Sequence, residues 1–130
     1  MKKILPLLLS PLALAACGVS GSEESYEQIS MYKALSQMAK EEHSILLDVR
    51  TTEEYHDGHI PGAINIANES IRTDEIPELP DKGQRIYVYC RSGNRSKKAA
   101  RILAENGYEV VELGTGFLGW FDSGRKVVKP

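Results

Sequence analysis

The sequence predicts an α/β domain with a mostly parallel central sheet and helices on both faces. From Tyr26 onward, short β-rich runs alternate with stretches of helical periodicity, which is the pattern of strand–helix–strand units. Two of these runs, residues 45–49 and 86–89, are apolar almost throughout, as is typical of strands buried on both faces. The chain of 130 residues has the length of one such domain.

Composition excludes several other classes of protein. Hydrophobic residues make up 42% of the chain and charged residues 26%, so a disordered or fibrous chain is excluded. Two cysteines and three histidines are too few for a disulfide-dense scaffold or a rich metal site, and we expect neither a metal nor a cofactor. The net charge of −2 creates no field that would attract nucleic acid.

The first half of the domain predicts a strand, a capped helix and two further strands. Residues 26–29 form the first strand, and Ser30 can cap a helix. That helix is indicated by apolar residues at helical spacing, namely Met31, Leu35, Met38 and Ala39. Residues 45–49 form a buried strand, and residues 64–66 form a short strand after the Pro61–Gly62 turn.

The second half continues the alternation. Residues 69–76 predict a weak short helix that ends before Pro77, and residues 86–89 predict a buried strand. A strong helix is predicted over residues 96–106 and is stopped by Gly107, with Ala99, Ala100, Ile102 and Leu103 on its inward face. A strand over residues 109–113 and one helical turn over 117–121 complete the domain. Ligands of such sheets bind beyond the carboxyl ends of the strands, which points to the segment after Tyr89.

The first 25 residues indicate export. Lys2 and Lys3 precede an apolar run over residues 4–16, and these 13 residues are fewer than the roughly 20 of a membrane-spanning helix. The stretch Leu14–Cys17 resembles a bacterial lipobox, in which the cysteine is lipidated before cleavage. We therefore expect a lipoprotein signal peptide over residues 1–16, and a lipid-anchored Cys17 with a flexible tether over 17–25. The alternative is an ordinary signal peptide cleaved near Ala16.

Lipidation would place the protein at the bacterial cell envelope, on the periplasmic side if there are two membranes. A diacylglycerol carries two chains, which is enough for stable anchoring. The mature chain would keep 14 basic residues against 18 acidic ones, a net charge of −4. Gly18, rather than an aspartate, favours the outer membrane by analogy with bacterial lipoproteins. Cys90 would then be the remaining free thiol.

Residues 90–96 carry the strongest chemical signal. They read Cys90-Arg91-Ser92-Gly93-Asn94-Arg95-Ser96 and lie between the end of a buried strand and the start of a helix. Backbone N–H groups of such a loop can converge into an anion-binding nest, and the helix N-terminus adds to the positive field. Cationic residues flank the loop, namely Arg91, Arg95, Lys97, Lys98 and Arg101. We expect the pKa of Cys90 to lie well below its usual value of about 8.5.

The chain resembles the rhodanese (sulfurtransferase) family in three stretches between Tyr26 and Lys126. Residues 47–50, 54–55 and 58–66 look like the N-terminal signature of the family, and residues 90–96 look like its active-site loop. Residues 113–116, followed by Trp120 and Gly124, look like its C-terminal signature. Thr115 stands where many members have consecutive glycines. The chain looks like a secreted single-domain member similar to phage-shock-type periplasmic rhodaneses, and the domain would span residues 26–130.

The resemblance implies a two-step sulfur transfer. The Cys90 thiolate would attack the outer sulfur of a donor such as thiosulfate, release sulfite and carry a persulfide, which cyanide or a thiol acceptor would then take. The N–H groups of the loop would stabilise the anionic sulfur. Arg91 would meet the anionic head of the donor, and Arg95 would close the loop. The expected partners are a small anionic sulfur donor, a thiol or cyanide acceptor, and the membrane through Cys17, without nucleic acid.

Several alternatives stand beside sulfur transfer. A non-catalytic rhodanese-like binding module is one, although such modules usually lack the cysteine. A thiol redox-sensing module would need a partner thiol once Cys17 is acylated. Phosphatase or arsenate reductase chemistry uses a Cys-x5-Arg loop, whereas only four residues separate Cys90 from Arg95. The shorter loop makes a cradle suited to a single extra sulfur atom.

Other polar and aromatic residues have structural interpretations. We expect Asp48 to pair with Arg50 or with backbone donors, and His59 to pack and hydrogen-bond within a turn. Phe117 and Trp120 are expected in the core or in a pocket wall. A zinc site is disfavoured because few ligand-type side chains lie near Cys90 in the sequence.

Overall fold

A computed structural model of the chain describes residues 26–72 and 75–130. Its strands form a five-stranded sheet in the order β1-β5-β4-β2-β3, and every neighbouring pair is parallel. The strands are β1 (Glu27–Ile29), β2 (Ser44–Asp48), β3 (Ile64–Asn65), β4 (Arg85–Tyr89) and β5 (Glu109–Leu113). The helices are α1 (Met31–Met38), α2 (Thr52–Asp57), α3 (Asn94–Glu105) and α4 (Gly116–Asp122), with a 3-10 turn η1 (Asn68–Ser70).

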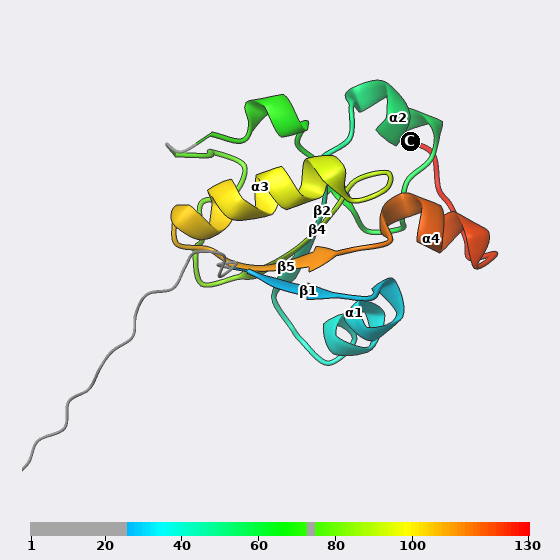
Figure 1. Cartoon of the computed structure of the whole chain (residues 1–130), viewed down its shortest axis with the longest axis horizontal. Coiled ribbons are helices and arrows are strands. Elements are labelled where there is room, and N and C mark those ends of the chain that lie inside the picture. The colour runs from blue at the N-terminus through cyan, green and yellow to red at the C-terminus, as the bar shows by residue number, and fades with distance from the viewer. Residues whose placement is uncertain (1–25, 73–74) are drawn as a thin grey trace, which may run out of the picture.

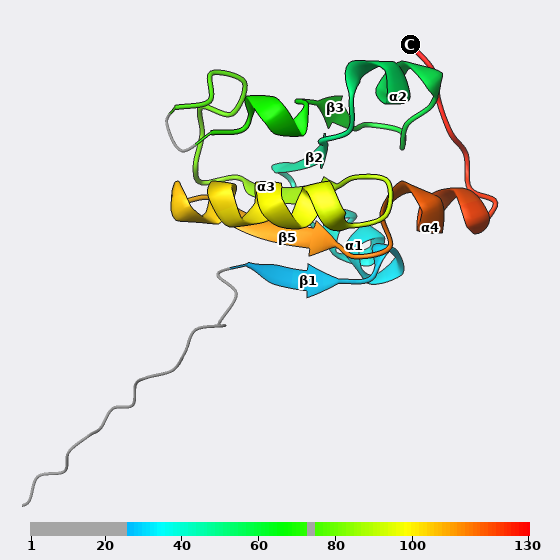
Figure 2. The same ribbon diagram turned by 45° about the horizontal axis from the view of Figure 1, so that its top comes forward.

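The sheet separates two apolar cores, and helices cover both faces (Figures 1 and 2). Side chains alternate along β4, so Ile86 and Val88 face the core under α3, while Tyr87 and Tyr89 face the core under α1 and α4. The predicted fold class is therefore confirmed. The same alternation places Cys90, the residue after β4, on the α3 side.

Most of the predicted elements are present, with small shifts of their ends. The Ser30 hydroxyl accepts a hydrogen bond from the backbone N–H of Lys33 at 3.1 Å and caps α1 as expected. Helix α3 begins at Asn94, two residues earlier than predicted, and Gly107 ends it with a φ of 99°. The turn expected at 117–121 is longer, because α4 runs over Gly116–Asp122.

The prediction of a helix over residues 69–76 is wrong. Among the residues described in this stretch, 69–72 and 75–76, the helical structure is limited to the 3-10 turn η1, and Ile71 and Ile76 are buried in the α3-side core. These two side chains anchor the connection to the sheet by burial, not by helical packing.

Helix α2 was not predicted. It begins with a capping box, in which the Thr51 hydroxyl accepts from the N–H of Glu54 at 3.1 Å and the Glu54 carboxylate accepts from the N–H of Thr51 at 2.9 Å. None of the residues of α2 is buried, so its sequence lacks the periodic apolar positions that indicate a helix. The Thr51-x-x-Glu54 spacing is the sequence signal that identifies such a helix.

The expected signal peptide over residues 1–16 and the expected lipid-anchored Cys17 with its tether over 17–25 lie outside the described residues. In the described ranges no helix combines the length and apolarity needed to cross a bilayer.

Candidate active site

The candidate site lies at the carboxyl ends of the strands, where α2, α4 and the loop before α3 meet (Figure 1). Cys90 directly follows β4 and is 1% exposed. The backbone N–H of Gly93 donates to Cys90 Sγ at 3.0 Å. Gly93 has a φ of 115°, a left-handed conformation that turns this N–H back toward the sulfur. The loop expected from the sequence is thus a backbone cradle around the cysteine.

The environment of Cys90 favours its thiolate. Burial raises the pKa of the thiol, but the hydrogen bond between Cys90 and the Ser96 side chain and those from the backbone N–H groups of Ser96, Gly93 and Ser92 outweigh it. The net pKa is below its ordinary value, as predicted. The largest lowering contributions are hydrogen bonds, and those from backbone N–H groups agree with the anion-binding nest expected from the sequence.

The other loop residues divide into an exposed and an inward set. Arg91, Ser92 and Asn94 are exposed. Ser96 is fully buried, and its Oγ lies 3.4 Å from Cys90 Sγ. Lys98 and Arg101, one turn further along α3, are exposed.

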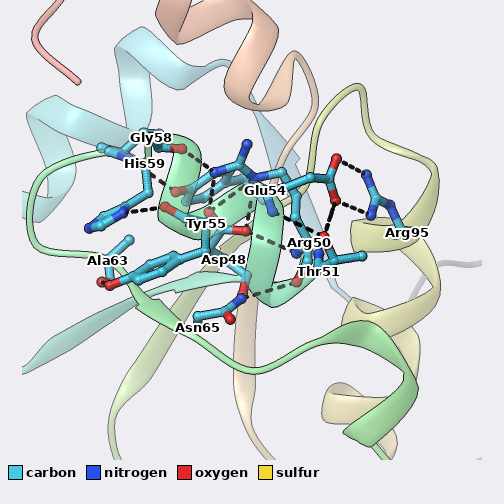
Figure 3. A network of polar contacts seen from close by, with 12 residues as sticks. Asp48, Arg50, Thr51, Glu54, Tyr55, Gly58, His59, Ala63, Asn65 and Arg95 are labelled. Atoms are coloured by element: carbon cyan, nitrogen blue, oxygen red, sulfur yellow. Dashed lines mark hydrogen bonds and ion pairs between the residues drawn. The ribbon is translucent and has the colours of Figure 1, made fainter. Parts of the chain in front are cut away.

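Arg95 joins α3 to α2. Its Nη1 and Nη2 donate to the two oxygens of Glu54 at 2.7 and 3.1 Å (Figure 3). This pair lowers the pKa of Glu54 to about 2. The ion pair fixes the first turn of α3 against a neighbouring element, and the expected role of Arg95 in closing the loop stays a prediction.

Helix α4 holds the loop from the other side. The N–H groups of Phe117 and Leu118 donate to the carbonyl oxygens of Cys90 and Arg91 at 2.8 and 3.1 Å. Gly116 permits this approach, because a Cβ on it would lie 2.6 Å from the Cys90 oxygen and its φ is 59°. Thr115 has a φ of −86°, so the departure from consecutive glycines needs no unusual backbone there.

A buried ion pair supports the floor of the site (Figure 3). Arg50 Nη2 lies 2.7 Å from Asp48 Oδ2 and also donates to the carbonyl oxygen of Gly58 at 2.7 Å. The Arg50 guanidinium lies 4.2 Å from the centre of the Phe117 ring. The expected pairing of Asp48 is confirmed, and it connects β2, the end of α2 and α4.

His59 and Trp120 have the structural roles that the sequence indicated. The His59 ring stacks on Tyr55 at 3.6 Å, and its Nδ1 lies 2.9 Å from the Tyr55 carbonyl oxygen. Trp120 is buried in the core under α1 and α4, and Phe117 packs against that core. In the described ranges there is no cluster of three or more histidine, cysteine or acidic side chains that could hold a metal ion.

A pocket of about 330 Å³ lies beside the loop. It is lined by Arg50, Glu54, Asp57, Gly58, Arg91, Phe117, Leu118, Phe121 and Val127. Its walls combine two arginines and two carboxylates with an apolar surface, and Arg91 is the exposed cation among them.

Sequence reasoning missed Glu112, the fourth residue of β5. It is fully buried, and the Ser96 hydroxyl donates to its Oε2 at 2.5 Å. Glu112 is one of two glutamates in β5, and the sequence does not distinguish it from Glu109, because its hydrogen-bond partner Ser96 comes from another element.

The fold and the cysteine loop define a rhodanese-like protein. Residues 31–123 match the model of the rhodanese-like domain, and the chain belongs to this family. Two curated relatives are sulfurtransferases. The chain is 40% identical over 70 residues to the thiosulfate sulfurtransferase PspE of Escherichia coli, a match that covers 54% of this chain and 67% of PspE. It is 37% identical over 102 residues to a sulfurtransferase of Allochromatium vinosum, covering 75% of this chain and 92% of that protein.

Solved structures agree with the fold. The BH2092 protein of Bacillus halodurans superposes with a TM-score of 0.70 at 33% identity, covering 81% of this chain and 77% of that one. A rhodanese-related protein of Thermoplasma volcanium gives 0.70 at 28% identity, covering 81% and 100%. Family and relatives together support a rhodanese-type enzyme with a sulfurtransferase-type function.

Proposed function

We propose that this protein is a thiosulfate sulfurtransferase in which Cys90 carries the sulfur. The observation that supports it most is the Cys90 sulfur facing the N–H of Gly93 at 3.0 Å in a loop with four residues between Cys90 and Arg95. The name of PspE adds support for thiosulfate as donor.

The reaction has two balanced steps. The Cys90 thiolate attacks the outer sulfur of thiosulfate, a new S–S bond forms at Cys90, and the old S–S bond breaks with its electron pair leaving on sulfite. A thiolate or cyanide then attacks the outer sulfur of the persulfide, and Cys90 leaves as thiolate. Backbone N–H groups of the loop stabilise the anionic outer sulfur in the manner of an oxyanion hole. Arg91, on the pocket wall, is placed to attract the sulfonate end of the donor.

Intact-mass spectrometry after brief incubation with thiosulfate tests this function. We expect the chain to gain one sulfur atom, and cyanide or a thiol to remove it. Cys90→Ser is the matched control, because it leaves every other residue, Cys17 included, unchanged. A gain that persists in Cys90→Ser, or no gain in a folded protein whose Cys90 still reacts with iodoacetamide, would contradict the proposal. An adduct formed from a persulfide but not from thiosulfate would retain sulfur transfer and reject the donor.

We also propose that the protein is exported and anchored through a lipid on Cys17. The lipobox pattern at Leu14–Cys17 behind a short apolar run supports this. Growth with a labelled fatty acid in a bacterial host should label the native chain and not Cys17→Ser, while Cys90→Ser should be labelled normally. An unlabelled native chain cleaved near Ala16 would indicate an ordinary signal peptide instead.

A further inference from the structure

A line of hydrogen bonds leads from Cys90 through the interior to the edge of the sheet. Cys90 Sγ lies 3.4 Å from Ser96 Oγ, and the Ser96 hydroxyl donates to Glu112 Oε2 at 2.5 Å. The other oxygen of Glu112 accepts from Gln28 Nε2 at 2.7 Å. Helix α3, strand β5 and edge strand β1 each contribute one residue to this line.

The line has a direction because each group offers a fixed number of protons. Both oxygens of Glu112 face donors, which fits an ionised carboxylate that only accepts hydrogen bonds. The Ser96 hydroxyl has a single proton, so it cannot donate to Glu112 and to Cys90 at the same time. While the proton points at Glu112, Ser96 Oγ turns a lone pair toward the sulfur.

We propose that Glu112 is a positioning residue for Cys90. The Glu112 carboxylate accepts the hydrogen bond of the Ser96 hydroxyl and thereby controls how readily Cys90 loses its own proton. The proposal rests on the function proposed for Cys90 and deepens it. In the resting protein the thiol donates to Ser96, and a thiolate depends on the backbone N–H groups of the loop. Nothing in the sulfur-transfer steps themselves assigns a role to Glu112.

Other charges also act on the sulfur and are common to all the variants below. Arg95 on α3, which is paired with Glu54, interacts electrostatically with Cys90, and Asp48 on β2 is neutralised by Arg50. Lys97 Nζ lies 3.1 Å from the position that a Cβ on Gly93 would occupy. Helix α4 contributes N–H groups that bind the loop carbonyls.

Substitution Glu112→Gln reverses the direction of the line. Gln28 still donates to the oxygen at the Oε1 position, so the new amide nitrogen faces Ser96 and donates to its Oγ. The Ser96 proton is then free to point at Cys90. We expect the pH midpoint of Cys90 ionisation to fall by about one unit, so that alkylation below the midpoint becomes about tenfold faster.

Substitution Ser96→Ala separates an effect through the hydroxyl from a direct effect of charge. In the native background we expect it to leave the midpoint nearly unchanged, because the hydroxyl proton is already committed to Glu112. In the Glu112→Gln background we expect it to cancel most of the fall. Such a double-mutant cycle isolates the coupling between the two residues.

The measurement is the ultraviolet absorbance of the thiolate and the rate of iodoacetamide alkylation across a pH series. Subtracting the signal of Cys90→Ser removes any contribution from Cys17. The control is Glu109→Gln, a carboxylate on the same strand that is exposed and paired with Arg85, and it should not move the midpoint. Thermal unfolding of each variant reports whether it folds.

Two results would overturn the proposal. A rise of about one unit in the pH midpoint of Cys90 in Ser96→Ala alone would show that the Ser96 hydroxyl already donates to the sulfur. This single variant tests the proposal even if Glu112→Gln does not fold. If the pH midpoint of Cys90 falls as far in the double variant as in Glu112→Gln, the charge of Glu112 acts on the sulfur directly and not through the Ser96 hydroxyl. These titrations need no sulfur donor. If the pH midpoint of Cys90 shifts as expected in a protein that does not take sulfur from thiosulfate, the sulfur-transfer proposal is rejected and the role of Glu112 is retained.

Discussion

Gly116 shows how one residue type shapes the site. Its φ of 59° and the 2.6 Å approach of a built Cβ to the Cys90 oxygen leave no room for a side chain. We expect Gly116→Ala to lower the free energy of unfolding by about 2–4 kcal/mol and to reduce sulfur loading, because the loop must move away from α4. Urea unfolding measures the first effect and intact mass the second.

Gly124→Ala is the matched control for Gly116. Gly124 also has a positive φ, 77°, but a Cβ there meets open space. It should cost only the conformational strain of about 1–2 kcal/mol and leave sulfur loading unchanged. Equal losses at the two positions would mean that the contact with the Cys90 oxygen is not the cause.

Asp48 and Arg50 form a buried ion pair that contributes to the stability of the fold. Asp48→Asn leaves the Arg50 guanidinium buried without its counter-charge, so we expect a loss of about 3–5 kcal/mol of unfolding free energy. Glu109→Gln breaks an exposed pair with Arg85 and should cost less than about 1 kcal/mol. Chemical denaturation compares the two variants, and similar losses would contradict the assigned importance of burial.

At the scale of elements, the contact between α2 and α3 depends on the ionisation of Glu54. Its pKa is lowered from 4.5 to about 2, first by the hydrogen bond from Arg95. A depressed folded-state pKa stabilises the protein above the unfolded value, so this contribution is complete above about pH 4.5 and is lost as the pH falls to about 2.

Glu54→Gln checks this dependence. The variant should be less stable than the native chain at neutral pH, and the difference should shrink between pH 4.5 and 2. Urea unfolding at a series of pH values measures it. Glu53→Gln, a neighbouring acid on the exposed side of α2, should leave the pH profile unchanged. A difference between native chain and Glu54→Gln that is constant with pH would show that the charge of Glu54 does not act through Arg95.

At the scale of the whole molecule, the described residues from Tyr26 onward supply two apolar cores, one on each face of the sheet. We therefore expect residues 26–130 to fold alone, with the same thermal midpoint as the full chain and the same sulfur loading at Cys90. Circular dichroism and calorimetry on the two chains measure the midpoint. A lower midpoint in the shorter chain would show that earlier residues contribute to the fold.

Local sequence was sufficient for most of the fold and for the centre of the site. Continuous apolar runs predict β2 and β4, because a parallel sheet covered on both faces has no polar side. A cysteine, a glycine and a helix start within one short segment predict the cradle around Cys90, because its hydrogen bonds are made within that segment. The helix expected over 69–76 was wrong because local propensity there is weaker than the burial of Ile71 and Ile76.

Contacts between distant segments lay beyond sequence patterns. Glu112 is 16 residues from Ser96 and 84 from Gln28, and Arg95 is 41 from Glu54. No period or spacing connects such residues, since only the order of strands in the sheet brings them together. The chain therefore encodes the nucleophile and its cradle locally, whereas the groups that set its protonation and hold its loop in place are assembled by the tertiary fold.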